Sequence, residues 1–239
     1  MIQIDPAPLS KFRDNNQALT GETHMPMISA QEALKRLQEG NQRFVSDLEN
    51  SQAHINQNRR DELTTGQEPF AAILGCSDSR VPVELIFDQG LGDLFVIRVA
   101  GNIVAPSQVG SIEFAAEAFG TRLVVVLGHS MCGAVQATLN ELERPSELRS
   151  PNLRSIVDHI RPSVGTLMET ELRDNRPELV RQAVRANIRA SANHLRHGSK
   201  FLEQQIRDAG LMVVGAEYSL ETGEVEFFDG MPEDSPIAV

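Results

Sequence analysis

Cysteine, long apolar runs and positive charge are all scarce in this chain. Two cysteines among 239 residues are too few for a disulfide framework, which favours a reducing, intracellular compartment. No apolar run approaches the roughly 20 residues that a membrane span requires. The stretch up to Met25 also lacks the apolar segment of a secretory signal. These absences predict a cytoplasmic protein with no membrane partner.

Basic residues are outnumbered by acidic ones. Lysine and arginine together number 22 against 33 aspartates and glutamates, which gives a net charge of −11 and a pI near 5.0. Neither nucleic acid nor an anionic membrane attracts such a surface. We therefore expect no nucleic-acid partner, and we expect the stripe of Arg181, Arg185 and Arg189 to be solvated or salt-bridged.

The length allows one large domain or two small ones, and we expect a single one. Residues 1–27 contain proline, glycine and asparagine with few apolar positions, so they are interpreted as an N-terminal arm or, alternatively, a disordered tail. Residues 28–230 form the predicted domain. Residues 231–239 form a predicted C-terminal tail.

Two apolar runs end abruptly in side chains that can bind a metal. Residues 70–74 carry no polar side chain, as expected of a strand buried on both faces, and Cys76 follows them. Residues 123–127 follow the same plan and lead to His129 and Cys132. Ligands of open α/β sheets lie beyond the carboxyl ends of the strands. If these two strands are neighbours, the three side chains meet, with Asp78 beside them.

Thiolate and imidazole are the donors that zinc favours. His129 and Cys132 are three residues apart, so one turn brings both side chains to one point, whereas Cys76 must reach them through the tertiary fold. Inert buried thiols and a redox pair or disulfide remain alternatives. Arg80 and the helix predicted after Cys132 favour the metal site, because both stabilise a charged sulfur.

Strand-like and helix-like segments alternate along the rest of the chain. A capping box at Ser29 opens the first predicted helix. The predicted strands are 70–74, 94–99, 123–127, 211–216 and 224–228. The predicted helices are one that begins at Ser29 and ends within the polar stretch 46–57, then 82–87, 107–119, 133–142, 148–172 with a break at Pro162, one beginning at Pro177, and 200–209. This order indicates an α/β fold of three layers, with a central, mostly parallel sheet of about five strands flanked by helices and an N-terminal helical arm.

Four motifs carry a family resemblance. They are CSDSRVP at 76–82, RVAGN at 98–102, GSIEF at 110–114 and GHSMCG at 128–133. In this order and spacing they resemble the motifs of β-class carbonic anhydrases, over roughly residues 28–228. Several independent matches that agree make the combination specific.

The resemblance implies an enzyme that reversibly hydrates carbon dioxide to bicarbonate and a proton, by attack of a zinc-bound hydroxide. Zn²⁺ is then held by Cys76, His129 and Cys132. Asp78 has two exclusive roles in this family: paired with Arg80 it orients the nucleophile, and released from Arg80 it becomes a fourth zinc ligand that closes the site. We expect the open state near neutral or alkaline pH.

The resemblance also implies a substrate pocket. Gln67 matches a glutamine that donates to bicarbonate, and Phe95, Ala100 and Phe114 match apolar wall positions. Many relatives carry tyrosine where Phe114 stands and a larger aliphatic residue at Ala100. Filling of the core is the alternative role for the two phenylalanines. In the family the pocket is completed across a dimer boundary, so a homodimer or a tetramer of dimers is implied.

Other functions of the same fold remain open. Relatives with this zinc shell hydrolyse carbonyl sulfide or carbon disulfide, and a non-catalytic scaffold or sensor is a further alternative. A bicarbonate-inhibited branch of the family has tryptophan where this chain has Ile73, and the chain contains no tryptophan, so no such inhibitory site is expected. The candidate proton shuttles are His24, His54, His159, His194 and His197.

Overall fold

The computed structural model describes residues 28–46, 60, 63–64, 66–145 and 150–232. The predicted arm (1–27) and all but two residues of the predicted tail (231–239) lie outside these ranges, together with His24 and His54. No described helix combines the length and apolarity needed to cross a membrane.

A five-stranded sheet forms the centre of the described chain. Its strands are β1 (Ala71–Gly75), β2 (Leu94–Arg98), β3 (Leu123–His129), β4 (Met212–Tyr218) and β5 (Val225–Asp229). They lie in the order β2-β1-β3-β4-β5, with β5 antiparallel to β4 and all other pairs parallel. The predicted α/β fold with a mostly parallel sheet is confirmed. The strand order reverses between β1 and β3, which is where open α/β sheets bind ligands.

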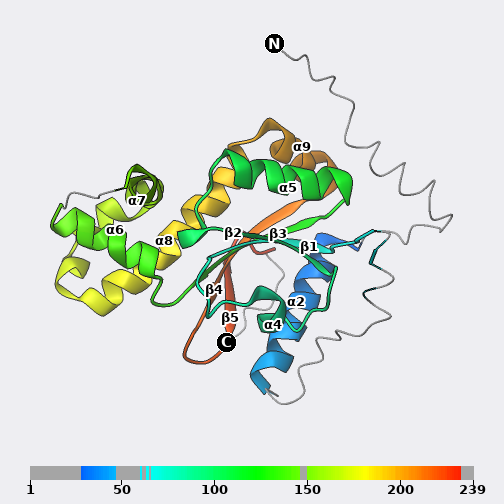
Figure 1. Cartoon of the computed structure of the whole chain (residues 1–239), viewed down its shortest axis with the longest axis horizontal. Coiled ribbons are helices and arrows are strands. Elements are labelled where there is room, and N and C mark those ends of the chain that lie inside the picture. Colours follow the sequence, from blue (N-terminus) through cyan, green and yellow to red (C-terminus); the bar gives the residue numbers. More distant parts are fainter. Residues whose placement is uncertain (1–27, 47–59, 61–62, 65, 146–149, 233–239) are drawn as a thin grey trace, which may run out of the picture.

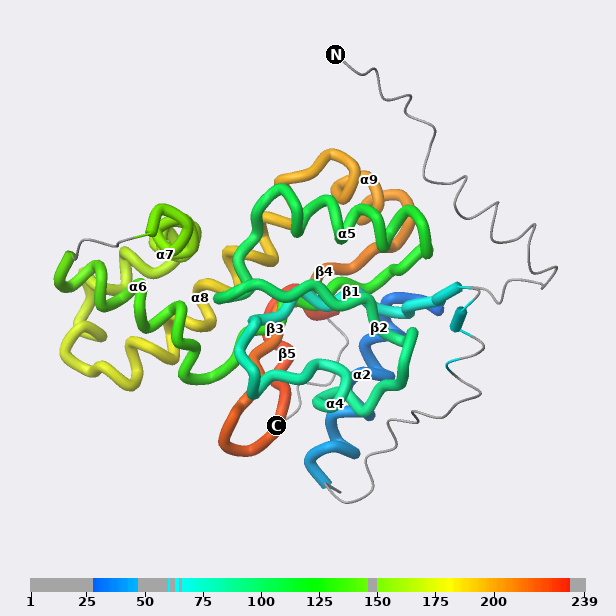
Figure 2. The backbone as a smooth tube through the Cα atoms, in the orientation of Figure 1, coloured from blue at the N-terminus to red at the C-terminus, as the bar shows by residue number. Residues whose placement is uncertain are grey.

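Helices cover both faces of the sheet, as Figure 1 shows. The helices are α2 (Ala30–Ser46), α4 (Val83–Ile86), α5 (Pro106–Ala118), α6 (Gly133–Glu143), α7 (Pro151–Val164), α8 (Arg176–His197) and α9 (Lys200–Ala209). Helices α5, α8 and α9 pack on one face and α2 and α4 on the other, while α6 and α7 lie beyond the carboxyl ends of the strands, beside α8 (Figures 1 and 2).

Side chains of the central strands alternate between two hydrophobic layers. Ala72 and Leu74 of β1 belong to the layer under α5 and α8, whereas Ala71 and Ile73 belong to the layer over α2 and α4. Successive side chains of a strand point to opposite faces, so a strand covered on both sides must be apolar throughout. The uninterrupted apolar sequence of β1 is the direct consequence.

Polar side chains fix the ends of several helices. The Ser29 hydroxyl accepts a hydrogen bond from the N–H of Glu32 (3.1 Å), so Ser29 caps α2 as the predicted capping box requires of it. Ser199 caps α9 in the same way by accepting from the N–H of Leu202 (3.2 Å), and Gly210 ends that helix with φ +71°.

Several predicted boundaries are wrong, among them the end of β4, which lies at Tyr218 instead of residue 216. Helix α7 continues through Pro162 and ends at Val164, where the chain enters the short 3₁₀ segments η2 (Gly165–Glu169) and η3 (Glu171–Asp174). Proline removes one intrahelical hydrogen bond, and in the last turn this loss does not end the helix at once. Strand β3 runs to His129 instead of residue 127, because its backbone stays paired with β4 as far as Tyr218.

The arginine stripe of α8 is salt-bridged, as predicted. Arg181 pairs with Glu178 (2.6 Å), and Arg185 pairs with Glu226 (2.6 Å) and with Glu217 on β4 (3.2 Å). Two arginines of the stripe also stack on one ring: the guanidinium carbons of Arg185 and Arg189 lie 3.8 and 4.8 Å from the centroid of Phe228.

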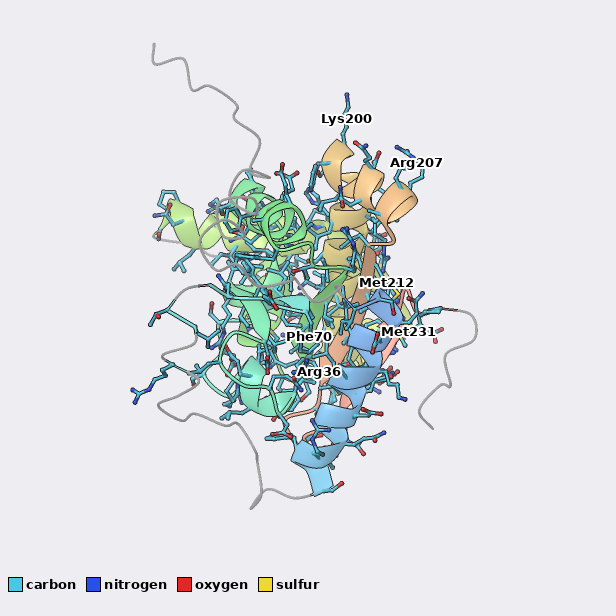
Figure 3. All side chains as sticks on the ribbon, turned by 90° about the vertical axis from the view of Figure 1, so that its right-hand side faces the viewer. Arg36, Phe70, Lys200, Arg207, Met212 and Met231 are labelled. Atoms are coloured by element: carbon cyan, nitrogen blue, oxygen red, sulfur yellow. The ribbon has the colours of Figure 1, made fainter. Side chains whose placement is uncertain are left out.

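Helix α2 is tied to segments that lie far from it in the sequence. The buried amide of Asn41 donates to the carbonyl oxygens of Ile86 (3.1 Å) and Gly223 (2.9 Å). Figure 3 shows Arg36 of the same helix beside Phe70, and the guanidinium carbon lies 4.1 Å from the ring centroid. In contrast, Lys200 and Arg207 of α9 point away from the body of the protein (Figure 3).

Gly40→Ala tests how closely α2 must approach Phe87, the residue that directly follows α4. A Cβ at Gly40 would lie 1.9 Å from the Phe87 carbonyl oxygen, so we expect the substitution to lower the free energy of unfolding by about 1–3 kcal/mol. Gly165→Ala is the control: its backbone is helical (φ −58°, ψ −44°) and no atom lies within 4 Å of the new Cβ. It should raise stability by about 0.4–1 kcal/mol. Equal denaturation midpoints for the two variants would contradict the close approach.

Candidate metal centre

The carboxyl ends of β1 and β3 bring the predicted donors together. The two strands pair with Gly75 opposite Leu127; Cys76 follows β1 directly and His129 is the last residue of β3. Cys132 lies at the N-terminus of α6. The sulfur atoms of Cys76 and Cys132 and a ring nitrogen of His129 all lie within 4.8 Å of one another. All three residues are at least 96% buried, with exposed fractions of 4%, 1% and 0%.

The imidazole of His129 presents a bare nitrogen to this cluster. Its Nδ1 lies 2.9 Å from the Ser130 carbonyl oxygen, which can only accept, so Nδ1 carries the proton and Nε2 the lone pair. Nε2 is buried and has no hydrogen-bond partner among the described residues. A neutral imidazole held through its other nitrogen is the usual arrangement of a metal ligand.

The two sulfurs share a proton. A hydrogen bond from Cys132 lowers the pKa of Cys76 to about 4, and the N–H of Gly101 acts in the same direction against the effect of burial. Donation to Cys76 and burial raise the pKa of Cys132. Both cysteines are free thiols. A divalent cation favours the deprotonated form of both, because the thiolate is the ligand.

A carboxylate is locked at the edge of this cluster. Arg80 donates to both oxygens of Asp78, from Nε (2.9 Å) and Nη2 (2.7 Å), and these bonds lower the pKa of the carboxyl group. Oδ2 of Asp78 lies 3.8 Å from Nε2 of His129. Asp78 is thus next to the donors while both of its oxygens are engaged by Arg80.

Sequence reasoning missed two groups that hold the Cys76 loop. Arg98 at the end of β2 donates to the carbonyl oxygens of Cys76 (3.0 Å) and Asp78 (2.6 Å). The N–H of Gly101 donates to the sulfur of Cys76 (3.3 Å). Arg98 could have been found from its place at the polar end of an apolar strand, as Cys76 was. The Gly101 contact has no such signal, since a backbone N–H is present at almost every position.

The predicted pocket residues are brought together only in part. Phe95 and Phe114 are half-buried with ring centroids 6.2 Å apart, and both contact Phe119. Ala100 opens the 3₁₀ turn η1 (Ala100–Asn102) beside Cys76. Gln67 is exposed and makes no hydrogen bond to the three donor side chains.

The described histidines other than His129 lie on helices far along the chain. His159 is exposed on α7 and its Nδ1 contacts the Ser155 carbonyl oxygen at 2.6 Å. His194 and His197 are exposed in the last turn of α8. None of the three hydrogen-bonds to the donor cluster.

Comparison with known proteins identifies the family. Residues 71–225 match the sequence profile of the family described as carbonic anhydrase. Carbonic anhydrase from Mycolicibacterium smegmatis is 38% identical over 84% of this chain and 95% of its own length. Carbonic anhydrase 2 from Mycobacterium tuberculosis is 37% identical over 86% of this chain and 96% of its own.

The solved structures narrow the class. The β-carbonic anhydrase CcaA is 29% identical with a TM-score of 0.67, over 82% of this chain and 95% of that one. The β-carbonic anhydrase CafA of Aspergillus fumigatus is 26% identical with a TM-score of 0.65, over 74% of this chain and 83% of that one. The chain belongs to the β-carbonic anhydrase family. As a β-carbonic anhydrase it is an enzyme of the lyase class, and the cluster at the ends of β1 and β3 is its candidate metal centre.

Elemental analysis tests this centre of the β-carbonic anhydrase. We expect about one divalent metal ion per chain in the purified protein, and a loss of metal affinity of at least about 100-fold in Cys132→Ser, because a ligand is removed outright. Ser77→Ala is the matched control, since Ser77 is exposed and adjoins Cys76. Metal-free wild-type protein, or a Cys132→Ser variant that keeps its metal, would contradict the assignment.

Proposed function

We propose that this protein catalyses the reversible hydration of carbon dioxide to bicarbonate and a proton, with Zn²⁺ held by Cys76, His129 and Cys132. Family membership supports the reaction. The donor set supports the metal, because thiolate and imidazole ligands select zinc over hard cations. The observation that carries the proposal is the bare, buried Nε2 of His129 among two free thiols, beside a carboxylate that a guanidinium holds in place.

Three protein ligands leave one position of a tetrahedral site for water, as in catalytic zinc sites. When bound, zinc acts as a Lewis acid that lowers the pKa of water, so that a hydroxide nucleophile is available near neutral pH. The chain must then orient this nucleophile, bind carbon dioxide beside it and stabilise the oxygens of the product.

Asp78 is the residue that we assign to orientation. Arg80 lowers the pKa of its carboxyl group, so it stays ionised and can accept a hydrogen bond from the nucleophile. The same two hydrogen bonds hold it away from the role of a fourth ligand, which supports the open state of the site. Arg98 helps to fix the position of Asp78 by donating a hydrogen bond to its backbone carbonyl oxygen.

The pocket for carbon dioxide is proposed to be lined by Phe95, Ala100 and Phe114. Carbon dioxide is small and apolar, so an apolar wall beside the nucleophile excludes competing water. The phenylalanine at Phe114 supplies an apolar wall without a hydroxyl group. We assign to Gln67 the donor that contacts a bicarbonate oxygen, and its exposure in the single chain is consistent with a site completed by a second chain.

A homodimer or a tetramer of dimers is proposed on two grounds. Strand β2 lies at the edge of the described sheet, and its Phe95, Val96 and Ile97 are only half-buried, which is typical of a strand covered by a partner. A solved structure that is 26% identical to this chain is one of two β-carbonic anhydrases of Sordaria macrospora that are described as tetrameric. The free thiols and the acidic composition support a cytoplasmic enzyme.

Light scattering tests the assembly. A dimer or tetramer has twice or four times the 26.3 kDa of one chain. Phe95→Glu should shift the measured mass toward that of one chain, because a charge on the edge strand opposes burial. Leu153→Glu on the exposed face of α7 is the control, since Leu153 is 56% exposed. A monomeric wild-type protein with full activity would contradict the proposed assembly.

Stopped-flow hydration assays on metal-quantified protein test the reaction itself. Asp78→Asn should lower kcat/KM about 10²–10⁴-fold with the metal retained, because the amide cannot replace the carboxylate as the acceptor that orients the nucleophile. Asp158→Asn makes the same chemical change at an exposed position of α7 and should leave hydration unchanged.

Three outcomes would overturn parts of the proposal. Release of sulfide from carbonyl sulfide or carbon disulfide without carbon dioxide hydration would make the protein a hydrolase of those substrates. Metal-loaded protein inactive on all of these substrates would favour a scaffold or sensor. Unchanged hydration by Asp78→Asn would remove Asp78 from the mechanism.

A further inference from the structure

A buried amide on α8 reaches the loop that contacts Cys76. Nδ2 of Asn187 donates to the carbonyl oxygen of Gly101 at 2.8 Å, across 86 residues of sequence. The N–H of the same glycine donates to the sulfur of Cys76 at 3.3 Å. Asn187 is only 2% exposed. One glycine therefore links the side chain of Asn187 to a proposed metal ligand.

The Gly101 conformation requires support from outside the loop. Gly101 has φ +71° and Asn102 has φ +42°, two successive residues in the left-handed region. Such a turn is unfavourable for Asn102 and persists where surrounding groups hold it. A Cβ on Gly101 would lie 2.8 Å from Cδ1 of Ile160, so packing closes the space around the loop. The Asn187 hydrogen bond then fixes the direction of its peptide groups.

Helix α8 lies against the Gly101 loop, which contacts Cys76, and against the end of β3, which carries His129. A Cβ on Gly128, the residue before His129, would lie 2.5 Å from Cδ1 of Ile188, so α8 lies against the backbone there. The buried face of α8 is otherwise mostly apolar, with Asn187 and Ser191 as its buried polar residues. A buried amide is costly unless it is hydrogen-bonded, so its presence calls for a specific partner. Gly101 is that partner.

We propose that Asn187 is a positioning residue of the metal centre. By holding the Gly101 carbonyl it keeps the Gly101 N–H directed at the Cys76 sulfur. An N–H···S hydrogen bond stabilises the thiolate and withdraws electron density from it, which tunes how strongly the sulfur binds a metal. The inference rests on the proposed metal site, with Asn187 acting through Gly101 and Cys76 and touching neither metal nor substrate.

The test replaces Asn187 by leucine, which has a similar volume and no donor. Zinc affinity measured by competition with a chelator should fall about 10–100-fold. In cobalt-substituted protein the sulfur-to-cobalt charge-transfer absorption should move to longer wavelength, because a sulfur without its hydrogen bond gives up charge more readily. Ser191→Ala is the control: it removes a buried polar group one turn along α8 and should change neither reading.

A second variant and a measurement on the wild type test the same contact independently of whether leucine fits. Asn187→Ala should give the same two changes if the leucine does not fit. In cadmium-113-substituted wild-type protein, the Gly101 amide proton should show scalar coupling to the metal through the N–H···S bond, and Asn187→Ala should lose it.

The outcomes separate this inference from the proposed function. Wild-type protein that binds none of the three metals would overturn the metal site itself. Metal-loaded wild type without the Gly101 coupling, or an Asn187 variant with unchanged affinity and spectrum, would overturn the inference alone. Failure of both Asn187 variants to fold, with Ser191→Ala folded, would assign Asn187 to the fold and overturn it as well.

Discussion

Parallel pairing of β1 with β3 is the constraint on which the rest of the site depends. It places two loops that are more than 50 residues apart in sequence at the carboxyl end of the sheet, so that Cys76 can meet His129 and Cys132. Neither loop carries enough donors to bind a metal alone. The pairing itself depends on strands that are apolar on both faces, and therefore on the helices of both layers. The chemistry of the site is thus a property of the whole fold.

Charge is distributed around this edge in a consistent way. The sulfurs and the imidazole are buried, whereas the arginines that surround them are more exposed and hold the loop through hydrogen bonds. Burying ionisable thiols is unfavourable unless their charge is compensated. Hydrogen bonds from the protein itself lower the pKa of Cys76. Arg80 and Arg98 bring two positive charges to the same loop. The protein therefore prepares the anionic form that a cation needs.

The sequence predicts the fold and the donors well because their signals are local. An apolar run followed by Cys76, or by His129 and Cys132, can be recognised from a few consecutive residues, and so can the capping box at Ser29. The position of Arg98 at the end of an apolar strand marks that residue, but the hydrogen-bond partners of Arg98 and Asn187 could not be predicted. A hydrogen bond between residues 22 or 86 positions apart leaves no pattern in either segment. The end of β3 was predicted wrongly for the same reason, because the residues that pair with its last two positions lie in β4, far along the chain.

The loop after β2, which contacts Cys76, and the loop that carries His129 and Cys132 solve one conformational problem in the same way. Each contains a residue with positive φ, Gly101 in one and Met131 in the other, because the chain must turn sharply to direct donors inward. In each loop the carbonyl of that residue accepts a hydrogen bond from a side-chain amide of a helix, Asn187 on Gly101 (2.8 Å) and Gln136 on Met131 (3.0 Å). An amide is suited to this task because it donates without adding charge beside the thiolates. Rigid helices, and not the loops themselves, thereby fix the geometry of the donors.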